Sequence, residues 1–493
     1  MGGPWCKSCS EKVANGPSTN RSAYCSPGTL VRMPRYWLET LGCPKNQVDS
    51  DKLIGLLESE GYRAAGRPGQ ADLVVVNTCA FIEAAREESI GAVLQLAALK
   101  KPGAKLAVTG CMAERYGQEL ADALPEVDQV AGFGVPVTTL CTNGSAPPSA
   151  PVRLVRSPRQ VAADARPVPS FDLLNLPRPP ARAPWAYVKI AEGCDRHCGF
   201  CAIPSFRGPQ QSRTAAAVLA EVEGLGAQEV VLVAQDLVSW CRDISRTGAN
   251  VVPLPGKSLA GGSADDGLVS LLRAVRERAE RARLLYIYPS GLTDELIDAV
   301  GESGCPYFDL SLQHVSRPLL RRMRRFGDGA RFLEKISTIR RRFPEAALRS
   351  SFIVGYPGET EEDHDALLAF LDEAQLDWAG FFAFSNEEGT YAARLAGHVA
   401  PTLVAERLRE CSEAQDVITA GKRNALVGSR CLALVDEPGQ ARSHREAPEI
   451  DGIITVPAHL PVGSWAQLEI TGAMGPDLVA VPVASRVGVG VTA

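Results

Sequence analysis

The sequence of 493 residues contains no run of about 18 or more apolar residues, which excludes a membrane-spanning helix of ordinary length. Its first residues show neither an apolar segment nor a cleavage site typical of export, so we expect a cytoplasmic location and no membrane partner. The sequence also lacks an excess of positive charge, because it contains 52 Lys and Arg and 57 Asp and Glu. The resulting net charge of −5 gives no general attraction to nucleic acid, and any such contact would need a local basic patch.

Cysteine, by contrast, is plentiful, with 14 residues. Thiols in a cytoplasmic protein normally stay reduced, so clustered cysteines suggest metal ligands and scattered ones suggest small buried apolar residues. The scattered group comprises Cys141, Cys241, Cys305, Cys411 and Cys431.

The most informative cluster is Cys194, Cys198 and Cys201, which lacks a fourth cysteine. Soft thiolates select iron–sulfur clusters or zinc, and ordinary electron carriers use a cysteine on each of four irons. Three cysteines therefore predict a [4Fe–4S] cluster with one iron open to a substrate or cofactor. Zinc is the alternative, but it usually takes four ligands in paired sets, and no partner pair follows nearby in the sequence.

Two stretches have the composition of unstructured chain. Residues 1–33 are rich in Gly, Ser, Asn and Pro without apolar periodicity, which predicts a disordered extension. Within it, Cys6, Cys9 and Cys25 leave half a zinc knuckle as the alternative. Residues 142–184 are dense in Pro, Ala and Ser and are predicted to be a linker.

Between these stretches, residues 34–141 alternate β-rich and helical runs, which predicts a Rossmann-like α/β domain. Cys43 follows the first expected strand, and Cys79 and Cys111 end the other two. Ligands bind at the carboxyl ends of strands in open parallel sheets, so we predict that these cysteines meet and hold a second cluster. Cysteine that merely packs at strand ends is the alternative. The expected elements are strands 35–42, 73–79 and 105–111 and helices 48–60 and 83–99.

The carboxyl-terminal two thirds of the chain predicts two more domains, which makes this an α/β multidomain protein. In residues 185–421 six β-rich runs are each followed by a helical pattern, as in a parallel barrel. In residues 422–493 short β-rich runs separated by Gly and Pro turns predict a small all-β barrel. The stretch 245–267 is predicted to be a surface insertion. The six expected strands are 186–192, 229–236, 284–290, 308–314, 348–355 and 380–385.

The cysteine motifs resemble those of the methylthiotransferases, a family within the radical S-adenosylmethionine (SAM) superfamily. The resemblance extends from Arg35 to about Ala480 and is carried by LGCPKN at 41–46, NTCAFI at 77–82, TGCM at 109–112 and EGCDRHCGFCAIP at 192–204. Further segments resemble the branch that modifies an aspartate of ribosomal protein uS12: YPSGLTDELI at 288–297, RSSFIVGYPGET at 349–360 and APEIDG at 447–452. The alternative is the MiaB-like branch, which modifies isopentenyladenosine in tRNA.

This resemblance implies a three-part fold: the Rossmann-like domain, a radical SAM (β/α)6 partial TIM barrel and a TRAM β-barrel. It implies two [4Fe–4S] clusters, with Cys194, Cys198 and Cys201 as catalytic ligands in the barrel. The auxiliary cluster would bind Cys43, Cys79 and Cys111. It also implies a uS12 (aspartate-C3)-methylthiotransferase that uses two SAM molecules to place sulfur and a methyl group on the aspartate β-carbon. A flavodoxin or ferredoxin would be the reductant.

Five residues are predicted to contact SAM. Phe200 lies between two cluster cysteines and is a candidate for packing on the adenine, with shielding of the cluster from water as the alternative. Gln235 and Asp236 end an expected barrel strand, where the chemistry of parallel barrels gathers, and are candidates for binding the SAM amino group. Ser351 and Gly355 flank a Gly-rich turn whose backbone could approach SAM, although a tight turn alone also favours glycine.

The charge of the predicted TRAM domain indicates which kind of macromolecule it binds. Residues 422–493 contain six Lys and Arg against seven Asp and Glu, which suits a basic protein better than the phosphates of tRNA. A non-enzymatic iron–sulfur scaffold would also need two cysteine sets, but it would not require a barrel with an open iron.

Overall fold

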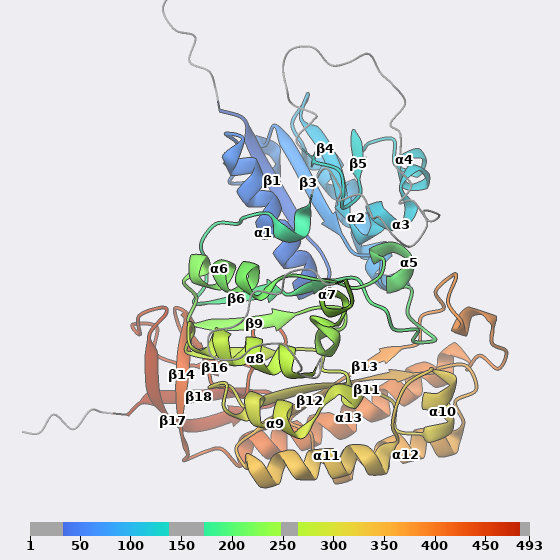
Figure 1. Cartoon of the computed structure of the whole chain (residues 1–493), viewed down its shortest axis with the longest axis vertical. Helices are drawn as coiled ribbons and strands as arrows, with labels where there is room; N and C mark the ends of the chain where they lie inside the picture. The colour runs from blue at the N-terminus through green and yellow to red at the C-terminus, as the bar shows by residue number, and fades with distance from the viewer. Residues whose placement is uncertain (1–32, 138–171, 248–264, 484–493) are drawn as a thin grey trace, which may run out of the picture. The chain divides into compact units, whose positions relative to one another are not determined.

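The computed structural model describes residues 33–137, 172–247 and 265–483 (Figure 1). Cys6, Cys9, Cys25 and Cys141 lie outside the described residues, as do nearly all of the predicted extension and most of the predicted linker. In the described part of the chain, no helix is long and apolar enough to cross a membrane.

The first domain is a five-stranded parallel sheet in the order β2-β1-β3-β4-β5. Successive residues of the central strand β3 point to opposite faces, as the pleat requires. Val74 and Val76 pack in one core with α2, whereas Leu73 and Val75 pack in the other with α1. Helices therefore cover both faces, as predicted for an α/β domain. The elements are β1 (Arg35–Thr40), α1 (Pro44–Ser59), β2 (Arg63–Ala64), β3 (Leu73–Thr78), α2 (Glu83–Leu99), β4 (Lys105–Gly110), α3 (Cys111–Tyr116), α4 (Gln118–Ala123) and β5 (Gln129–Ala131).

Helix α1 begins four residues before the predicted position of Val48. Pro44 occupies its first turn, where the missing backbone N–H of proline removes no hydrogen bond and its fixed φ suits a helix. Cys43 is the residue that caps this helix. The first cysteine of the predicted second set is thereby held between the end of β1 and the start of α1.

The second domain contains the six parallel strands expected for a partial barrel. They form two three-stranded sheets, β10-β9-β6 and β11-β12-β13, joined by a bridge between Ile287 and Leu310. The third strand was predicted at 284–290, which is wrong: it runs from Arg281 to Leu284, and the backbone turns to a positive φ at Tyr286. The strands are β6 (Trp185–Lys189), β9 (Glu229–Val233), β10 (Arg281–Leu284), β11 (Tyr307–Gln313), β12 (Ala347–Val354) and β13 (Trp378–Ala383).

Helices follow the strands and cover the outside of this barrel. Helices α11, α12 and α13 lie side by side along β11, β12 and β13 (Figure 1). The predicted insertion 245–267 is described only at its ends, which belong to α7 and α8. The remaining elements are β7 (Ala191–Glu192), α5 (Ile203–Arg207), β8 (Gln211–Ser212), α6 (Ala215–Leu225), α7 (Arg242–Thr247), α8 (Asp265–Arg276), α9 (Asp294–Gly301), α10 (Arg317–Arg322), α11 (Gly329–Arg342), α12 (Glu361–Ala374) and α13 (Pro401–Asn424).

The third domain is a closed barrel in the order β14-β15-β16-β18-β17, which confirms the predicted small all-β barrel. Closure leaves no free strand edge. Its core is small and apolar and includes Ala433, Ile454 and Leu468. The strands are β14 (Arg430–Glu437), β15 (Gln440–Arg442), β16 (Ile454–Thr455), β17 (Trp465–Met474) and β18 (Asp477–Pro482).

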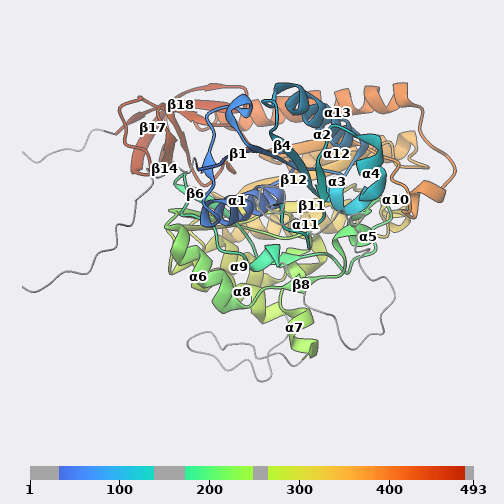
Figure 2. The same ribbon diagram turned by 90° about the horizontal axis from the view of Figure 1, so that it is seen from above.

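This small barrel packs against the amino-terminal ends of the parallel strands, beside β6 in Figure 2. Glu229, the first residue of β9, is fully buried and pairs with Arg442 of β15 at 3.2 Å. The Nη2 of Arg281, the first residue of β10, donates to the carbonyl of Leu432 at 2.8 Å. The cysteine loop, which follows β6 and β7, lies at the opposite, carboxyl end of the strands.

Candidate functional site

The three cysteines of the barrel lie together in the loop that follows β7. Burial is the main cause that raises the pKa of Cys194 to about 11 and that of Cys201 to about 12, and the charge of Cys198 contributes to both shifts. The thiols are therefore close enough to repel one another when ionised. The loop is fixed by backbone bonds from Cys194 N to Gly208 O at 3.1 Å and from Gly199 N to Met323 O at 2.7 Å.

Two arginines and a tyrosine surround this loop, and none of them was expected from the sequence. The guanidinium groups of Arg196 and Arg325 lie 3.5 and 3.9 Å from the ring centroid of Tyr288. Arg325 Nη1 also donates to the sulfur of Cys198 at 3.5 Å. The site therefore has cations beside the sulfurs, which a negatively charged cluster requires. Tyr288 is the first residue of the YPSGLTDELI segment, which the sequence analysis noted as a family motif. The motif alone did not indicate that this tyrosine lies beside the cysteine loop.

The second cysteine set lies at the carboxyl ends of three adjacent parallel strands, as predicted. Cys43 follows β1, Cys79 follows β3, and Cys111 follows β4 directly as the first residue of α3. Burial is the main cause that raises the pKa of Cys79 to about 12, and the charges of Cys111 and Cys43 contribute to this shift. Burial also opposes ionisation of Cys43, but Lys45 and Arg207 outweigh it and hold its pKa below the ordinary value. These three thiols also form one group.

Asn46 ties the ends of β1 and β3 together beside this second set. Its Nδ2 donates to the carbonyls of Leu41 and Thr78, at 2.9 and 3.0 Å, and its Oδ1 accepts from Arg207 at 2.8 Å. Leu41 precedes the Cys43 loop, and Thr78 immediately precedes Cys79. The sequence analysis noted the LGCPKN motif but assigned no role to its asparagine, because bonds to distant carbonyls are not visible in a pattern.

Replacement of Asn46 by Ala is expected to lower the free energy of unfolding by about 2 to 4 kcal/mol, because two carbonyls near buried cysteines lose their donor. Thermal unfolding of the protein without iron measures this effect directly. Gln118→Ala is the control, since the Gln118 amide donates to Asp122 at an exposed position. Equal stability of the two variants would contradict a linking role for Asn46.

Gly110 shows why the second set needs glycine beside a cysteine. Its φ is +91°, and an added Cβ would lie 2.3 Å from Asn77 Oδ1 and 2.5 Å from the carbonyl oxygen of Thr78. Any side chain there would push β4 away from β3 and separate Cys111 from Cys79.

A buried charged network joins the two cysteine sets. Arg207, at the end of α5, donates from Nη2 to the sulfur of Cys111 at 2.9 Å and pairs through Nη1 with Glu192 at 2.7 Å. Burial raises the pKa of Glu192, but Arg207 and Lys189 outweigh it, so the net pKa is lowered and the carboxylate stays ionised. Since Glu192 is two residues before Cys194, the network runs from one set to the flank of the other.

A second connection lies on the side of β13. Glu387, in the loop after β13, is buried and accepts from Arg86 of α2 at 2.6 Å and from Arg115 of α3 at 2.7 Å. Arg115 also donates to the carbonyl of Ala80, next to Cys79, at 3.0 Å. This carboxylate therefore holds two helices of the first domain against the barrel.

The predicted SAM-contacting residues occupy different places. Gln235 and Asp236 follow β9 beside the cysteine loop, where Gln235 donates to Glu192 at 2.5 Å and Asp236 accepts from Arg196 at 2.6 Å. Gln235 Oε1 and Asp236 Oδ1 are buried without a hydrogen-bond partner, so each could take a donor from a bound molecule.

Phe200 is half-buried and packs against the barrel core, and Ser351 lies within β12 opposite Gly380. Gly355 follows β12 with a φ of +83°, and an added Cβ would lie 2.5 Å from Val404 of α13. The turn and the packing of α13 account for this glycine. SAM contacts by these three residues remain predictions.

Zinc fits the two cysteine sets less well than a cluster does. Among residues 33–137, 172–247 and 265–483, no three His, Cys, Asp or Glu side chains are arranged around a single metal ion. Three cysteines of a cubane cluster bind three different irons, so they stand farther apart than the ligands of one zinc. Neighbouring thiols with cationic groups beside them match the cluster.

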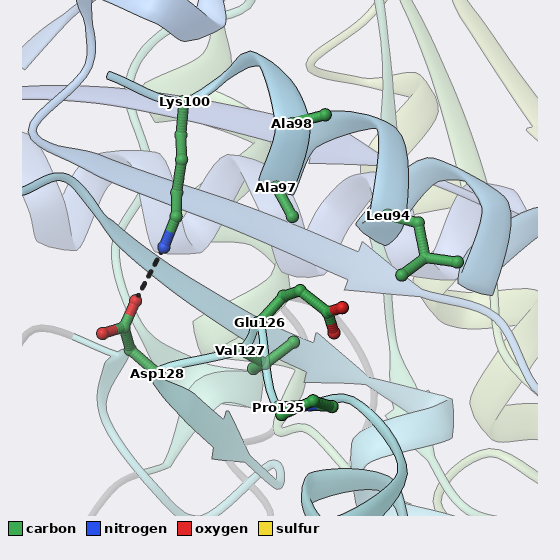
Figure 3. A pocket seen from close by; sticks show the side chains of 8 residues that line it. All are labelled: Leu94, Ala97, Ala98, Lys100, Pro125, Glu126, Val127 and Asp128. Atoms are coloured by element: carbon green, nitrogen blue, oxygen red, sulfur yellow. Dashed lines mark hydrogen bonds and ion pairs between the residues drawn. The ribbon is translucent and has the colours of Figure 1, made fainter. Parts of the chain in front are cut away.

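A surface pocket elsewhere in the first domain does not contribute to this site. It lies between the end of α2 and the segment before β5, beside the ion pair of Lys100 and Asp128 at 3.1 Å (Figure 3). Asp128 also pairs with Lys105, the first residue of β4. The pocket is therefore at the amino-terminal edge of the sheet, opposite the cysteines.

Comparison with known families assigns each domain. Residues 188–371 match the radical SAM superfamily, residues 427–483 match the TRAM domain, and residues 35–132 match a family described as uncharacterized protein family UPF0004. The barrel and its cysteine loop thus define a radical SAM enzyme, whose cofactors are SAM and a [4Fe–4S] cluster.

Curated relatives then place the chain within that superfamily. It is 39% identical over 489 residues to ribosomal protein uS12 methylthiotransferase RimO of Streptomyces coelicolor, with 90% of this chain and 96% of that protein covered. It is 40% identical over 453 residues to the RimO protein of Moorella thermoacetica, with 89% and 97% covered. The chain belongs to the RimO family of methylthiotransferases.

Among solved structures, the chain is similar to the radical SAM methyltransferase TsrM from Kitasatospora setae. The two share 16% identity and a TM-score of 0.43, over 71% of this chain and 75% of that one. The cobalamin-dependent SAM radical enzyme OxsB has 11% identity and a TM-score of 0.41, over 78% and 56% of the two chains.

Proposed function

We propose that this protein transfers a methylthio group to the β-carbon of an aspartate in ribosomal protein uS12, using two [4Fe–4S] clusters and two SAM molecules. The observation that carries the proposal is the pair of cysteine sets, each at the carboxyl ends of parallel strands and joined by Arg207 and Glu192. The names of the curated relatives supply the substrate.

In this proposal Cys194, Cys198 and Cys201 would hold three irons of one cluster, which would leave the fourth iron open to SAM. Cys43, Cys79 and Cys111 hold the auxiliary cluster. When bound, these groups supply a one-electron reductant for SAM and a source of sulfur, which is the chemistry required to convert an unactivated C–H bond into a C–S bond.

The chain's own residues prepare the site for that chemistry. Buried thiols release their protons when they bind metal, and the guanidinium groups near Cys198 and Cys111 offset the resulting negative charge. In this proposal the oxygens of Gln235 and Asp236 that have no hydrogen-bond partner accept hydrogen bonds from the amino group of SAM. Tyr288, held between Arg196 and Arg325, helps to exclude water from the cysteine loop.

The charges of the TRAM domain favour a protein over tRNA. Arg423 and Arg442 are buried in ion pairs with Glu446 and Glu229, so they are not available to phosphates. Arg430 is exposed but lies 3.7 Å from Glu469. Lys422 and Arg445 lie 3.5 and 3.7 Å from the carboxylate of Asp377. The reductant is proposed to be a small electron carrier such as flavodoxin or ferredoxin.

Mass spectrometry of ribosomal proteins and tRNA from cells with and without this gene tests the substrate. We expect uS12 to lose a mass corresponding to a methylthio group on one aspartate peptide, with tRNA nucleosides unchanged. Loss of a methylthio group from tRNA adenosine would instead establish the MiaB-like alternative. No change in either would reject both substrates.

A further inference from the structure

Arg207 is a side chain that touches the second cysteine set and also reaches toward the first. Its side chain is 2% exposed, and its two terminal nitrogens point to different partners. Nη2 donates to the sulfur of Cys111 at 2.9 Å and to Asn46 Oδ1 at 2.8 Å. Nη1 pairs with Glu192 at 2.7 Å and lies 3.5 Å from Asp49.

The surroundings fix this guanidinium in one orientation. It lies 4.4 Å from the ring centroid of Phe133, which covers one face. Glu192 is itself held by Lys189 at 2.8 Å and by Gln235 at 2.5 Å. Because the fork cannot rotate without breaking buried ion pairs, the donor toward Cys111 keeps its direction whether or not a cluster is present.

We propose that Arg207 is a positioning residue for the auxiliary cluster: its N–H···S bond to Cys111 raises the reduction potential of a cluster bound by Cys43, Cys79 and Cys111. Reduction adds one negative charge to the cluster and its thiolates, and a buried cation with a hydrogen bond to sulfur stabilises that charge. This inference rests on the proposed auxiliary cluster. An arginine that served only as a structural ion-pair partner would leave the potential unchanged.

The test uses the full chain with Cys194→Ala, Cys198→Ala and Cys201→Ala, so that iron and sulfide reconstitute only the auxiliary site. The midpoint potential is measured by a redox titration followed by electron paramagnetic resonance. We expect Arg207→Met to lower the potential by about 59 mV or more, which is a tenfold change in the one-electron equilibrium. Arg207→Lys keeps the positive charge but loses the two-pronged guanidinium group. Its midpoint potential should therefore lie between those of the parent and Arg207→Met.

Arg283→Lys is the matched control. Arg283 is also fully buried, pairs with Glu229 at 2.7 Å and lies 4.4 Å from the ring centroid of Tyr307, but it belongs to the interface with the TRAM domain. It should lose stability as Arg207→Lys does and keep the parent potential.

The outcomes separate this inference from the proposed function. If the parent triple variant binds no iron–sulfur cluster, the auxiliary site itself is wrong and Arg207 has no cluster to position. If the parent binds a cluster and both Arg207 variants keep its potential, only the role of Arg207 is overturned. If Arg207→Met binds no iron, the test rests on Arg207→Lys. A midpoint potential below that of the parent supports the role of Arg207, and a potential equal to that of the parent overturns it.

Discussion

Replacement of Cys194 by Ala is expected to reduce the formation of 5′-deoxyadenosine from SAM to the level seen without protein. The loop supplies three thiols for three irons, so the loss of one leaves two irons open and removes the single site for SAM. Replacement of Cys43 by Ala should instead retain cleavage of SAM and abolish methylthio transfer, because Cys43 belongs to the other domain. Both products can be measured by chromatography with a chemical reductant such as dithionite.

Cys411→Ala controls for the simple loss of a buried cysteine. Cys411 lies in α13 and is fully buried, so its removal changes packing without touching either cysteine set. We expect it to retain both products. Formation of 5′-deoxyadenosine by Cys194→Ala at the parent rate would reject the barrel assignment, and loss of SAM cleavage in Cys43→Ala would assign a structural role to the second set.

The sequence predicted the two cysteine sets because both follow from local rules. Cys194, Cys198 and Cys201 are spaced for one loop, and parallel strands bring their carboxyl ends to one edge. The same rule brings Cys43, Cys79 and Cys111 together at one edge of the sheet. The three-domain architecture was predictable for the same reason, since helical and β-rich runs alternate with clear periods.

The connections between the sets were not predictable. Arg207 and Glu192 both belong to the barrel, but the bond from Arg207 to Cys111 depends on the packing of one domain on another. Glu387 meets Arg86 and Arg115 across about 300 and 270 residues, and no sequence period spans such a separation. The third barrel strand was misplaced because Tyr286 adopts a positive φ, which is uncommon for a large side chain and has no local signal.

Glu229→Ala is expected to lower the free energy of unfolding by about 3 to 5 kcal/mol, among the largest effects outside the cysteines. Glu229 pairs with Arg283 at 2.7 Å and Arg442 at 3.2 Å, and all three side chains are buried. Removal of the carboxylate leaves two buried cations without this partner. Urea unfolding followed by tryptophan fluorescence measures the effect, because Trp465 lies 4.4 Å from Arg281 in the same interface.

Glu223→Ala is the control for that measurement. Its partner Arg278 lies 2.7 Å away at an exposed position, where such pairs contribute about 0 to 1 kcal/mol. A loss of stability in Glu229→Ala no greater than in Glu223→Ala would show that the buried network does not hold the TRAM domain on the barrel.

The same carboxylate should make the stability of the protein sensitive to acid. Burial alone would raise the pKa of Glu229, but Arg283, Arg442 and Arg281 outweigh it and lower the pKa from 4.5 to about 2. A lowered pKa contributes stability that is fully present above the unfolded value of 4.5 and is lost as the pH falls toward 2. The difference in stability between the parent and Glu229→Gln should therefore be largest above about pH 5 and should shrink between about pH 4.5 and 2. A constant difference across that range would mean that folding does not lower the pKa of Glu229, and that the three arginines are balanced by other groups.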